Sequence, residues 1–165
     1  MMYDCSIEGL ELFDAKEEHI PNLLFLIQKI AEYEKMSDEV TASYESLKES
    51  IFEKKRAHVI LAKYQNEIVG YMLYFYNYST FTGSANLYLE DIFILKEYRK
   101  LGIGKTFFKI LAQIACKNHC KRIDWVCLNW NEPSLNFYKS IHAKRLDYWV
   151  LHRLEEIDIK NLANS

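Results

Sequence analysis

The sequence has few of the residues that break or staple a chain, with only two prolines, five glycines and four cysteines among 165 residues. So little proline and glycine excludes collagen-like and linker-rich chains. No apolar run reaches the roughly 18 residues that a membrane span needs, and the first residues lack the basic and apolar stretches of a signal peptide. We therefore expect a cytoplasmic protein that does not bind a membrane.

The chain also lacks an excess of either charge, since 21 basic residues face 23 acidic ones for a net charge of −2. Binding to nucleic acid requires a cationic surface that neutralises phosphates, so no nucleic-acid partner is expected. Half of the residues are hydrophobic, which excludes intrinsic disorder. This length suits one domain with a substantial core, and we expect a single domain over residues 1–165.

Three of the cysteines gather in one stretch, Cys116, Cys120 and Cys127, with His119 among them. A zinc site is conceivable there, but the spacing does not repeat the C-x-x-C pattern of zinc motifs. The alternative is that Cys116 and Cys120 lie one helical turn apart as small apolar residues facing a core. We favour this alternative and predict no metal.

Hydrophobic periodicity and turn residues predict a mixture of helices and strands. Strands are expected over Leu10–Phe13, His58–Lys63, Ile68–Tyr78, Leu87–Leu95, Arg122–Leu128 and Tyr148–Leu154. Helices are expected over Ile20–Tyr33, Tyr44–Phe52, Lys105–Asn118 and Asn131–Ile141. Asp14 and Glu17 have the spacing of a capping box before the first helix. The order predicts a mixed sheet with helices on it, in the α/β or α+β class.

The most informative window is Arg99-Lys100-Leu101-Gly102-Ile103-Gly104-Lys105, which holds two of the five glycines between a predicted strand and a predicted helix. Glycine lets backbone amides approach a ligand closely, and the amides at a helix N-terminus bind phosphate. The basic residues of the window add positive charge. The window therefore predicts an anion site, although a solvated glycine turn has the same composition.

Three phosphate-binding loops compete for this window. The dinucleotide fingerprint G-x-G-x-x-G fails because Phe107 stands where its third glycine is required. The nucleotide P-loop fails because Arg99 stands where its first glycine is required. The remaining pattern is [QR]-x-x-G-x-[GA], which resembles the pyrophosphate loop of the GNAT acetyltransferases.

Other windows narrow this resemblance to the spermidine/spermine (diamine) N-acetyltransferase branch. They are Ala31–Met36, Tyr88–Asp91, Tyr98–Arg99, Asn131–Ser134 and Asn136–Tyr138. The similarity runs from about Leu23 to Trp149. It implies a GNAT fold with a central mixed, mostly antiparallel sheet flanked by helices, acetyl-CoA as co-substrate, a small-molecule amine as acceptor, and a homodimer.

The resemblance also implies site residues. Glu90 and Asp91 are the only carboxylates in an otherwise apolar strand, and such groups need a partner or a purpose if the strand is central. The alternative is that the strand crosses into solvent at a bulge. Glu90 is expected to act as a water-assisted base on the amine, and Tyr138 as the acid for the departing thiolate. The acetyl-pantetheine arm is expected to meet the backbone of Ile92, Phe93 and Ile94, together with Asn131 and Ser134. Both polar residues are also ordinary helix caps.

For the acceptor, Tyr33 and Glu34 match substrate-contacting positions of the diamine branch, and Asp91 and Asp147 would add negative charge. We therefore expect acetyl transfer to a polyamine or diamine by direct attack in a ternary complex. The alternatives are thialysine, another amino acid or a protein amino group as acceptor, and, from a different class, a non-catalytic acyl-CoA sensor. The sequence departs from the family at Lys100 and His142, where glycine is usual, and it is shorter after Leu146.

Overall fold

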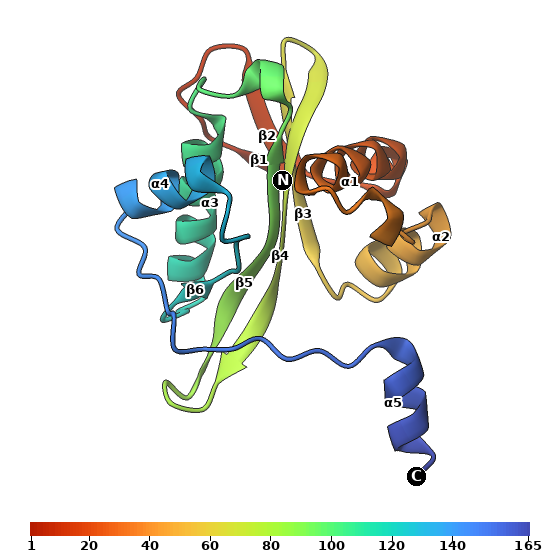
Figure 1. Cartoon of the computed structure of the whole chain (residues 1–165). Coiled ribbons are helices and arrows are strands. Elements are labelled where there is room, and N and C mark those ends of the chain that lie inside the picture. The colour runs from red at the N-terminus through yellow and green to blue at the C-terminus, as the bar shows by residue number, and fades with distance from the viewer. The chain divides into compact units, whose positions relative to one another are not determined.

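A six-stranded sheet organises the chain, and its strands follow one another in sequence order from β1 to β6 (Figure 1). The computed structural model describes residues 1–165, which form two compact units, Met1–Val126 and Cys127–Ser165. The strands are β1 Met2–Tyr3, β2 Leu10–Asp14, β3 His58–Tyr64, β4 Glu67–Ser79, β5 Ser84–Ile94 and β6 Ile123–Asp124. All neighbouring strands are antiparallel except β5 and β6, which are parallel. The predicted mixed, mostly antiparallel sheet is confirmed.

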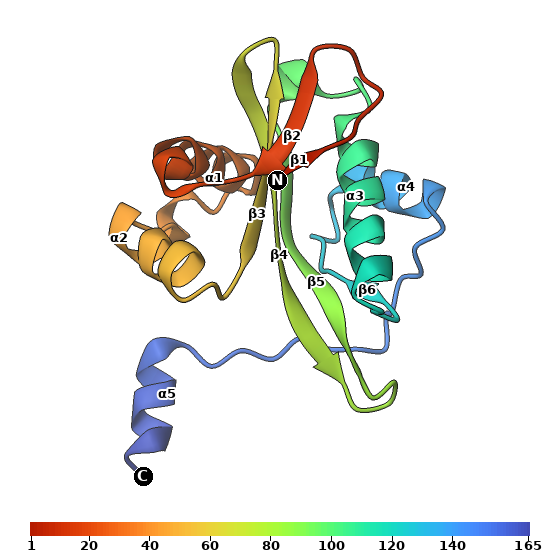
Figure 2. The ribbon, with the colours of Figure 1, turned by 180° about the vertical axis from the view of Figure 1, so that it is seen from behind.

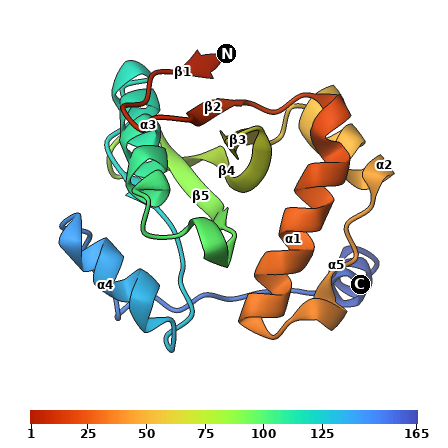
Figure 3. The same ribbon diagram turned by 90° about the horizontal axis from the view of Figure 1, so that it is seen from above.

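Helices cover both faces of this sheet within the first unit. They are α1 Ile20–Glu34, α2 Tyr44–Leu47, which continues as the π-helical η3 Lys48–Glu53, and α3 Ile103–Lys117. Figures 2 and 3 show α1 and α2 against one face and α3 against the other. The second unit contains α4 Glu132–Ser140 and α5 Glu156–Ala163. None of these helices has the length and apolar character that crossing a bilayer requires.

Each face of the sheet has its own apolar layer because strand residues alternate between the faces. On the α1 face, the buried cluster consists of Leu23, Leu26, Ile51, Val59, Leu61, Tyr71 and Phe93. On α3, the buried side chains recur at helical spacing and are Ile103, Phe107, Phe108, Ile110, Leu111 and Ala115. Removing this much apolar surface from water is the main stabilising contribution to the fold.

The turn predicted between the strands β3 and β4 is present in the structure. Gln65 and Asn66 both have positive φ angles, 48° and 72°, as the two-residue turn between β3 and β4 requires. The helix α3 then carries the chain across the sheet from β5 to β6, which is the connection that a parallel pair needs.

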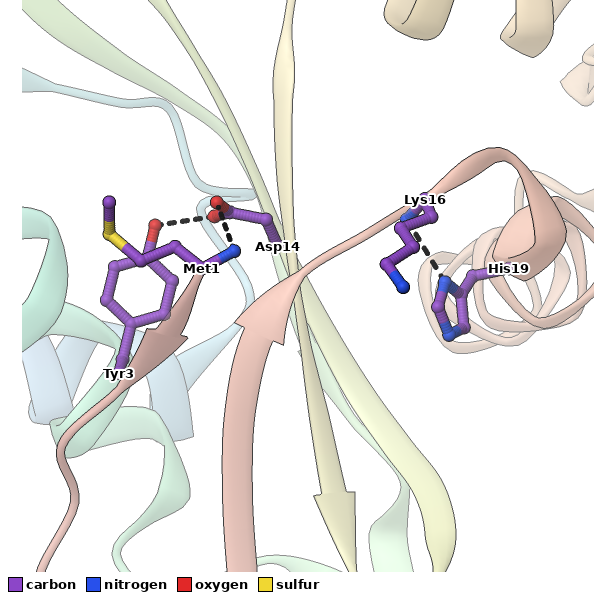
Figure 4. Close-up of polar contacts among 5 residues, drawn as sticks. All are labelled: Met1, Tyr3, Asp14, Lys16 and His19. Carbon is purple, nitrogen blue, oxygen red and sulfur yellow. Dashed lines mark hydrogen bonds and ion pairs between the residues drawn. The ribbon is translucent and has the colours of Figure 1, made fainter.

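The predicted capping box at the start of the first helix is wrong. Asp14 ends β2, and its carboxylate accepts hydrogen bonds from the Tyr3 hydroxyl at 2.5 Å and from the Met1 amine at 3.0 Å (Figure 4). The backbone amide of Lys16 instead donates to Nδ1 of His19 at 3.0 Å. The pairing of β1 with β2 brings Tyr3 to Asp14, and a two-residue strand is too short to leave a pattern in the sequence.

The predicted closing strand over Tyr148–Leu154 is also wrong. These residues form neither helix nor strand and their side chains are exposed, including Tyr148 at 77% and Trp149 at 69%. The composition favours a strand, but a strand exists only through its partner, and none pairs here. The predicted strand Arg122–Leu128 shortens to Ile123–Asp124, and α5 was not predicted.

The prediction that Cys116 and Cys120 both face a core is wrong. Cys116 is exposed in the last turn of α3, and Cys120 lies beyond the end of that helix. None of the four cysteines forms a disulfide, and no group of three or more His, Cys, Asp or Glu side chains is arranged to hold a metal ion.

Candidate active site

The strand β5 loses its neighbour on one side halfway along its length. Strand β6 pairs only with Leu87 and Tyr88, while β5 continues to Ile94. Beyond Tyr88, no strand pairs with this edge, so its backbone groups are not part of a ladder there. The backbone of Ile92, Phe93 and Ile94, predicted to meet the acyl arm, lies in this unpaired stretch.

Glu90 occupies the point where the two halves of β5 meet. Leu73 pairs with Asp91 and Tyr74 pairs with Leu89, so Glu90 is the extra residue of a β-bulge. Bulges redirect side chains and are frequent next to active sites. The Glu90 side chain is exposed, and its charge contributes to raising the pKa values of Tyr71 and Tyr88, behind the larger effect of burial in each case.

Asp91 points to the α1 face and meets groups from two other elements. The hydroxyl of Tyr71, a fully buried residue of β4, donates to Oδ2 of Asp91 at 2.8 Å. Glu34, in the last turn of α1, lies close enough for the two carboxylates to repel each other. Three acidic or phenolic groups from α1, β4 and β5 therefore converge, and we call Glu34, Tyr71 and Asp91 the acidic cluster.

The pKa values of the acidic cluster are shifted by burial. Burial raises the pKa of Glu34 above its ordinary value, and the nearby Asp91 raises it further. Burial also raises the pKa of Asp91, and the hydrogen bond from Tyr71 partly offsets this by lowering it. Burial and the Asp91 carboxylate together raise the pKa of Tyr71 well above its ordinary value, so its hydroxyl stays protonated.

Helix stability does not explain why Glu34 stands at the end of α1. A negative charge in the last turn opposes the helix dipole. Lys35 ends the helix in the left-handed conformation, with φ at 62°, and its backbone amide donates to the carbonyls of Ala31 and Glu32. This end is fixed, and it presents Tyr33 and Glu34 to the sheet.

The predicted anion loop follows β5 and is held at its first residues. The 3₁₀ turn η4 Lys96–Tyr98 begins it, and the Tyr98 hydroxyl donates to Glu67 at 2.6 Å. Lys100 and Gly102 adopt positive φ angles of 66° and 87°. The chain then enters α3 at Ile103, two residues earlier than predicted, so Gly104 lies inside the first helical turn.

The first turn of α3 has no side-chain cap, since Gly102 occupies the N-cap position. The first amides of a helix lack internal acceptors and carry the positive end of the dipole, which suits an anion. The side chains of Lys100 and Lys105 are exposed on either side of this turn. The arrangement fits a pyrophosphate group.

The Arg99 side chain contacts α1 and β5. Its guanidinium lies over the Tyr33 ring, 4.8 Å from the centroid, and over the Phe93 ring at 5.5 Å. Its Nε donates to the carbonyl of Ile94 at 2.9 Å. Of the residues predicted for the site, the structure thus brings together Tyr33, Phe93, Ile94 and Arg99.

The remaining predicted residues belong to the second unit. Asn131 is 7% exposed and is the N-cap of α4, where its Oδ1 accepts from the Ser134 amide at 3.4 Å. Tyr138 lies on the same helix, half-buried, with its ring 5.7 Å from that of Phe137. Asp147 is exposed and forms an ion pair with the Arg145 side chain.

Sequence reasoning missed two residues of the first unit, Tyr71 and Gly70. Tyr71 is one of several aromatic residues in its strand, so no signal distinguished it. A Cβ atom on Gly70 would lie 2.5 Å from the carbonyl oxygen of Phe93. A glycine inside a strand indicates such a close approach, and this signal was available in the sequence.

Comparisons relate the chain to known proteins. The model of the acetyltransferase (GNAT) family matches residues 23–142. The chain is 36% identical over 164 residues to thialysine N-epsilon-acetyltransferase of Bos taurus, covering 92% of this chain and 96% of the relative. It is 29% identical over 174 residues to spermidine/spermine N(1)-acetyltransferase-like protein 1 of Homo sapiens, covering 98% of this chain but 25% of that protein. A solved integron cassette protein of V. cholerae superposes with a TM-score of 0.79 at 27% identity, covering 95% of this chain and 99% of the other.

Proposed function

The chain belongs to the GNAT family of acetyltransferases, and on this premise we propose that it acetylates the side-chain amine of a lysine-like amino acid such as thialysine. It is an N-acetyltransferase that uses acetyl-CoA. The assignment of the acceptor substrate rests on the 36% identity to the bovine thialysine enzyme over nearly the whole of both chains. The comparisons support this alternative better than the polyamine or diamine that we first expected, which becomes the second candidate.

For the cofactor, we propose that the loop from Arg99 to Lys105 binds the pyrophosphate of acetyl-CoA through its backbone amides. The uncapped start of α3 and the positive φ angle of Gly102 support this, because both leave amides able to meet an anion. We further propose that the unpaired edge of β5 at Ile92, Phe93 and Ile94 binds the amides of the pantetheine arm, as an added strand would. When bound, acetyl-CoA supplies an activated acyl group.

For the amine, the difficulty is its charge. A lysine-like amine has a pKa near 10.4, so keeping it neutral at pH 7 costs about 4.6 kcal/mol. We propose that Glu90 removes this proton through a water molecule. Its place at the bulge of β5, exposed and next to the unpaired edge, supports this role.

For the leaving group, we propose that Tyr138 donates a proton to the thiolate, with Asn131 and Ser134 binding the pantetheine arm. An ordinary phenol, with a pKa of about 10, is protonated at neutral pH and so able to donate. The spacing of Asn131 and Tyr138 on one helix supports the assignment.

For the acceptor's cationic groups, we propose Tyr33, Glu34 and Asp91 as contacts, with Asp147 as an additional one. Glu34 and Asp91 are partly buried carboxylates that form no ion pair with a lysine or arginine of the chain. Buried carboxylates without a cation are costly, so a bound ammonium group would relieve them. The same chemistry favours the second candidate, a polyamine.

A substrate panel tests the acceptor. We would follow free thiol from acetyl-CoA with thialysine, lysine, spermidine and a monoamine. We expect kcat/KM for thialysine to exceed that for spermidine at least about tenfold, a difference of about 1.4 kcal/mol in transition-state binding. The reverse order would establish the polyamine candidate, and no turnover with any amine would contradict the proposed function.

We also propose that residues 1–165 form a single domain and that the protein is a homodimer. The family match from 23 to 142 spans the boundary between the two units, which supports one domain. Many large apolar side chains between residues 146 and 162 are exposed, which supports an interface. Sedimentation equilibrium at micromolar concentration measures the mass directly, and a monomer would contradict the dimer.

A further inference from the structure

Arg99 is the first residue of the phosphate-loop pattern, yet its side chain is used elsewhere. Three contacts hold it, the rings of Tyr33 and Phe93 and the carbonyl of Ile94. These contacts come from the end of α1 and from the end of β5. The guanidinium thus joins three segments that meet beside the acidic cluster: α1, β5 and the loop.

The chemistry of this contact depends on arginine specifically. A guanidinium is planar and weakly hydrated, so it stacks on aromatic rings while its N–H groups donate in the plane. Lysine carries the same charge but is a compact, strongly hydrated ammonium without a face to stack. The partly buried position of Arg99 strengthens the attraction to the rings.

The contact leads directly to the amine side of the candidate site. Tyr33 precedes Glu34, whose carboxylate faces Asp91. The ring that Arg99 contacts therefore belongs to the same helical turn as one carboxylate of the acidic cluster. The neighbouring Lys100 has no such contact with aromatic rings, and its side chain is exposed at the loop.

We propose that Arg99 is a positioning residue for the amine, holding Tyr33 and the last turn of α1 against β5, while loop amides, Lys100 and Lys105 hold the phosphates. This assignment rests on the proposed function for the location of the amine. It separates two roles that the loop pattern assigns to one binding site: the backbone of the loop serves the cofactor and its first side chain serves the acceptor.

The test compares Arg99→Gln with Lys100→Gln, a matched loss of one positive charge at the next residue. Arg99→Gln should raise KM for the amine about 2- to 30-fold, the range that the energy of one cation–π contact covers. The affinity for acetyl-CoA, measured by calorimetry, should change less than about twofold. Lys100→Gln should weaken acetyl-CoA and leave the amine KM nearly unchanged. Arg99→Lys should resemble Arg99→Gln, because it restores charge without stacking.

A double-mutant cycle with Tyr33 tests the contact itself. In a Tyr33→Leu background, Arg99→Gln should have almost no further effect on KM, whereas in Tyr33→Phe it should keep its full effect because the ring remains. Additive effects in the Leu background would overturn the proposal. It would also be overturned if Arg99→Gln weakened acetyl-CoA as much as Lys100→Gln did while KM stayed constant.

A measurement without substrate separates this proposal from the proposed function. Ring currents of Tyr33 and Phe93 should shift the side-chain NMR signals of Arg99, and Tyr33→Leu should remove part of that shift. If the wild-type chain acetylates no amine, the proposed function fails. The NMR shift and the two acetyl-CoA affinities would still decide where the guanidinium acts, and an unshifted Arg99 would overturn its assigned place.

Discussion

At the scale of single residues, the acidic cluster is the clearest departure from what stability alone would select. Asp91 is partly buried near another carboxylate, and its single described hydrogen bond comes from Tyr71. Replacing a buried charge by a neutral group of the same shape is often neutral or stabilising. Two carboxylates at this place lower the stability of the fold, and binding a cation would explain why they are present.

Asp91→Asn should therefore reduce activity and increase stability at neutral pH. The amide cannot attract an ammonium group as a carboxylate does, and we expect kcat/KM for the amine to fall about 10- to 100-fold, as for loss of a charged hydrogen bond. Thermal unfolding should show a higher Tm for the variant at pH 8 than for the wild type.

The pH dependence of that difference follows from the raised pKa of Asp91. A carboxyl group whose pKa is raised in the folded state binds a proton more readily there than in the unfolded chain, so it destabilises the fold as pH rises through its folded pKa. The Tm advantage of Asp91→Asn should accordingly shrink as pH falls toward about 4, near the ordinary Asp pKa. A Tm difference that is constant with pH would contradict this.

Tyr138→Phe tests the proton donor. The change removes the hydroxyl and keeps the ring, so packing against Phe137 should persist. We expect kcat to fall about 10²- to 10⁴-fold, the usual scale of general acid catalysis, with acetyl-CoA affinity little changed. If the folded variant keeps more than about a tenth of the wild-type kcat, the ring is a packing group and another donor serves the thiolate.

At the scale of elements, the site depends on β5 being paired differently along its length. Its first half has β4 on one side and, at Leu87 and Tyr88, β6 on the other, whereas its second half has only β4. Gly70 of β4 allows this second half to lie close, since a side chain there would meet the Phe93 carbonyl. The packing of two strands thus fixes the position of the backbone proposed to bind the acyl arm.

Gly70→Ala should destabilise the protein and disturb this edge. The added methyl would require backbone movement, for which a loss of about 1–3 kcal/mol is typical of overpacking, or roughly 2–12 °C in Tm. We expect acetyl-CoA binding to weaken in the variant at temperatures where it remains folded. Differential scanning calorimetry and titration measure the two effects.

Gly104→Ala is the matched control for stability. Its added methyl would lie 3.4 Å from the flexible end of Ile94, and its φ angle is not positive. Alanine in a helix is favoured over glycine by about 0.5–1 kcal/mol, so Tm should stay or rise. If Gly70→Ala is as stable as Gly104→Ala, the close approach of β4 to β5 is not a constraint.

At the scale of the whole molecule, a net charge of −2 hides local charges of both signs. Lysines flank the start of α3, while Glu34, Glu90 and Asp91 gather at β5 and the end of α1. At the sites proposed for them, an anionic cofactor and a cationic acceptor would therefore meet local fields of opposite sign on a nearly neutral protein. Each attraction is screened by salt to the extent that it is exposed to solvent.

Raising salt from about 0.05 to 0.5 M should raise KM for the amine, because the Debye length falls well below 10 Å. The increase should be larger for spermidine, which carries several positive charges, than for thialysine, whose carboxylate offsets one of its two. Initial rates at saturating acetyl-CoA measure this. Equal salt dependence for both acceptors and a monoamine would contradict a role for the acidic residues in attracting the acceptor.

Most local elements and the family could be predicted from the sequence alone. Ile20–Glu34 and Ile103–Lys117 follow from apolar residues at helical spacing, and the β3–β4 turn follows from Gln65 and Asn66. Such patterns depend on neighbouring residues, which is why they are readable. The family resemblance carried by Arg99–Lys105 is likewise local, and the family match confirmed it.

Contacts between residues that are distant in the chain depend on the tertiary fold. Tyr71 of β4 donates to Asp91 of the neighbouring β5, and Arg99 lies over Tyr33 from the last turn of α1. Tyr148–Leu154 remains without a strand partner. Pairing and stacking of this kind join residues far apart in the chain, so no local pattern encodes them. The bulge at Glu90 and the early end of β6 arise in the same way, because a strand's length is set by its neighbour and not by its own composition.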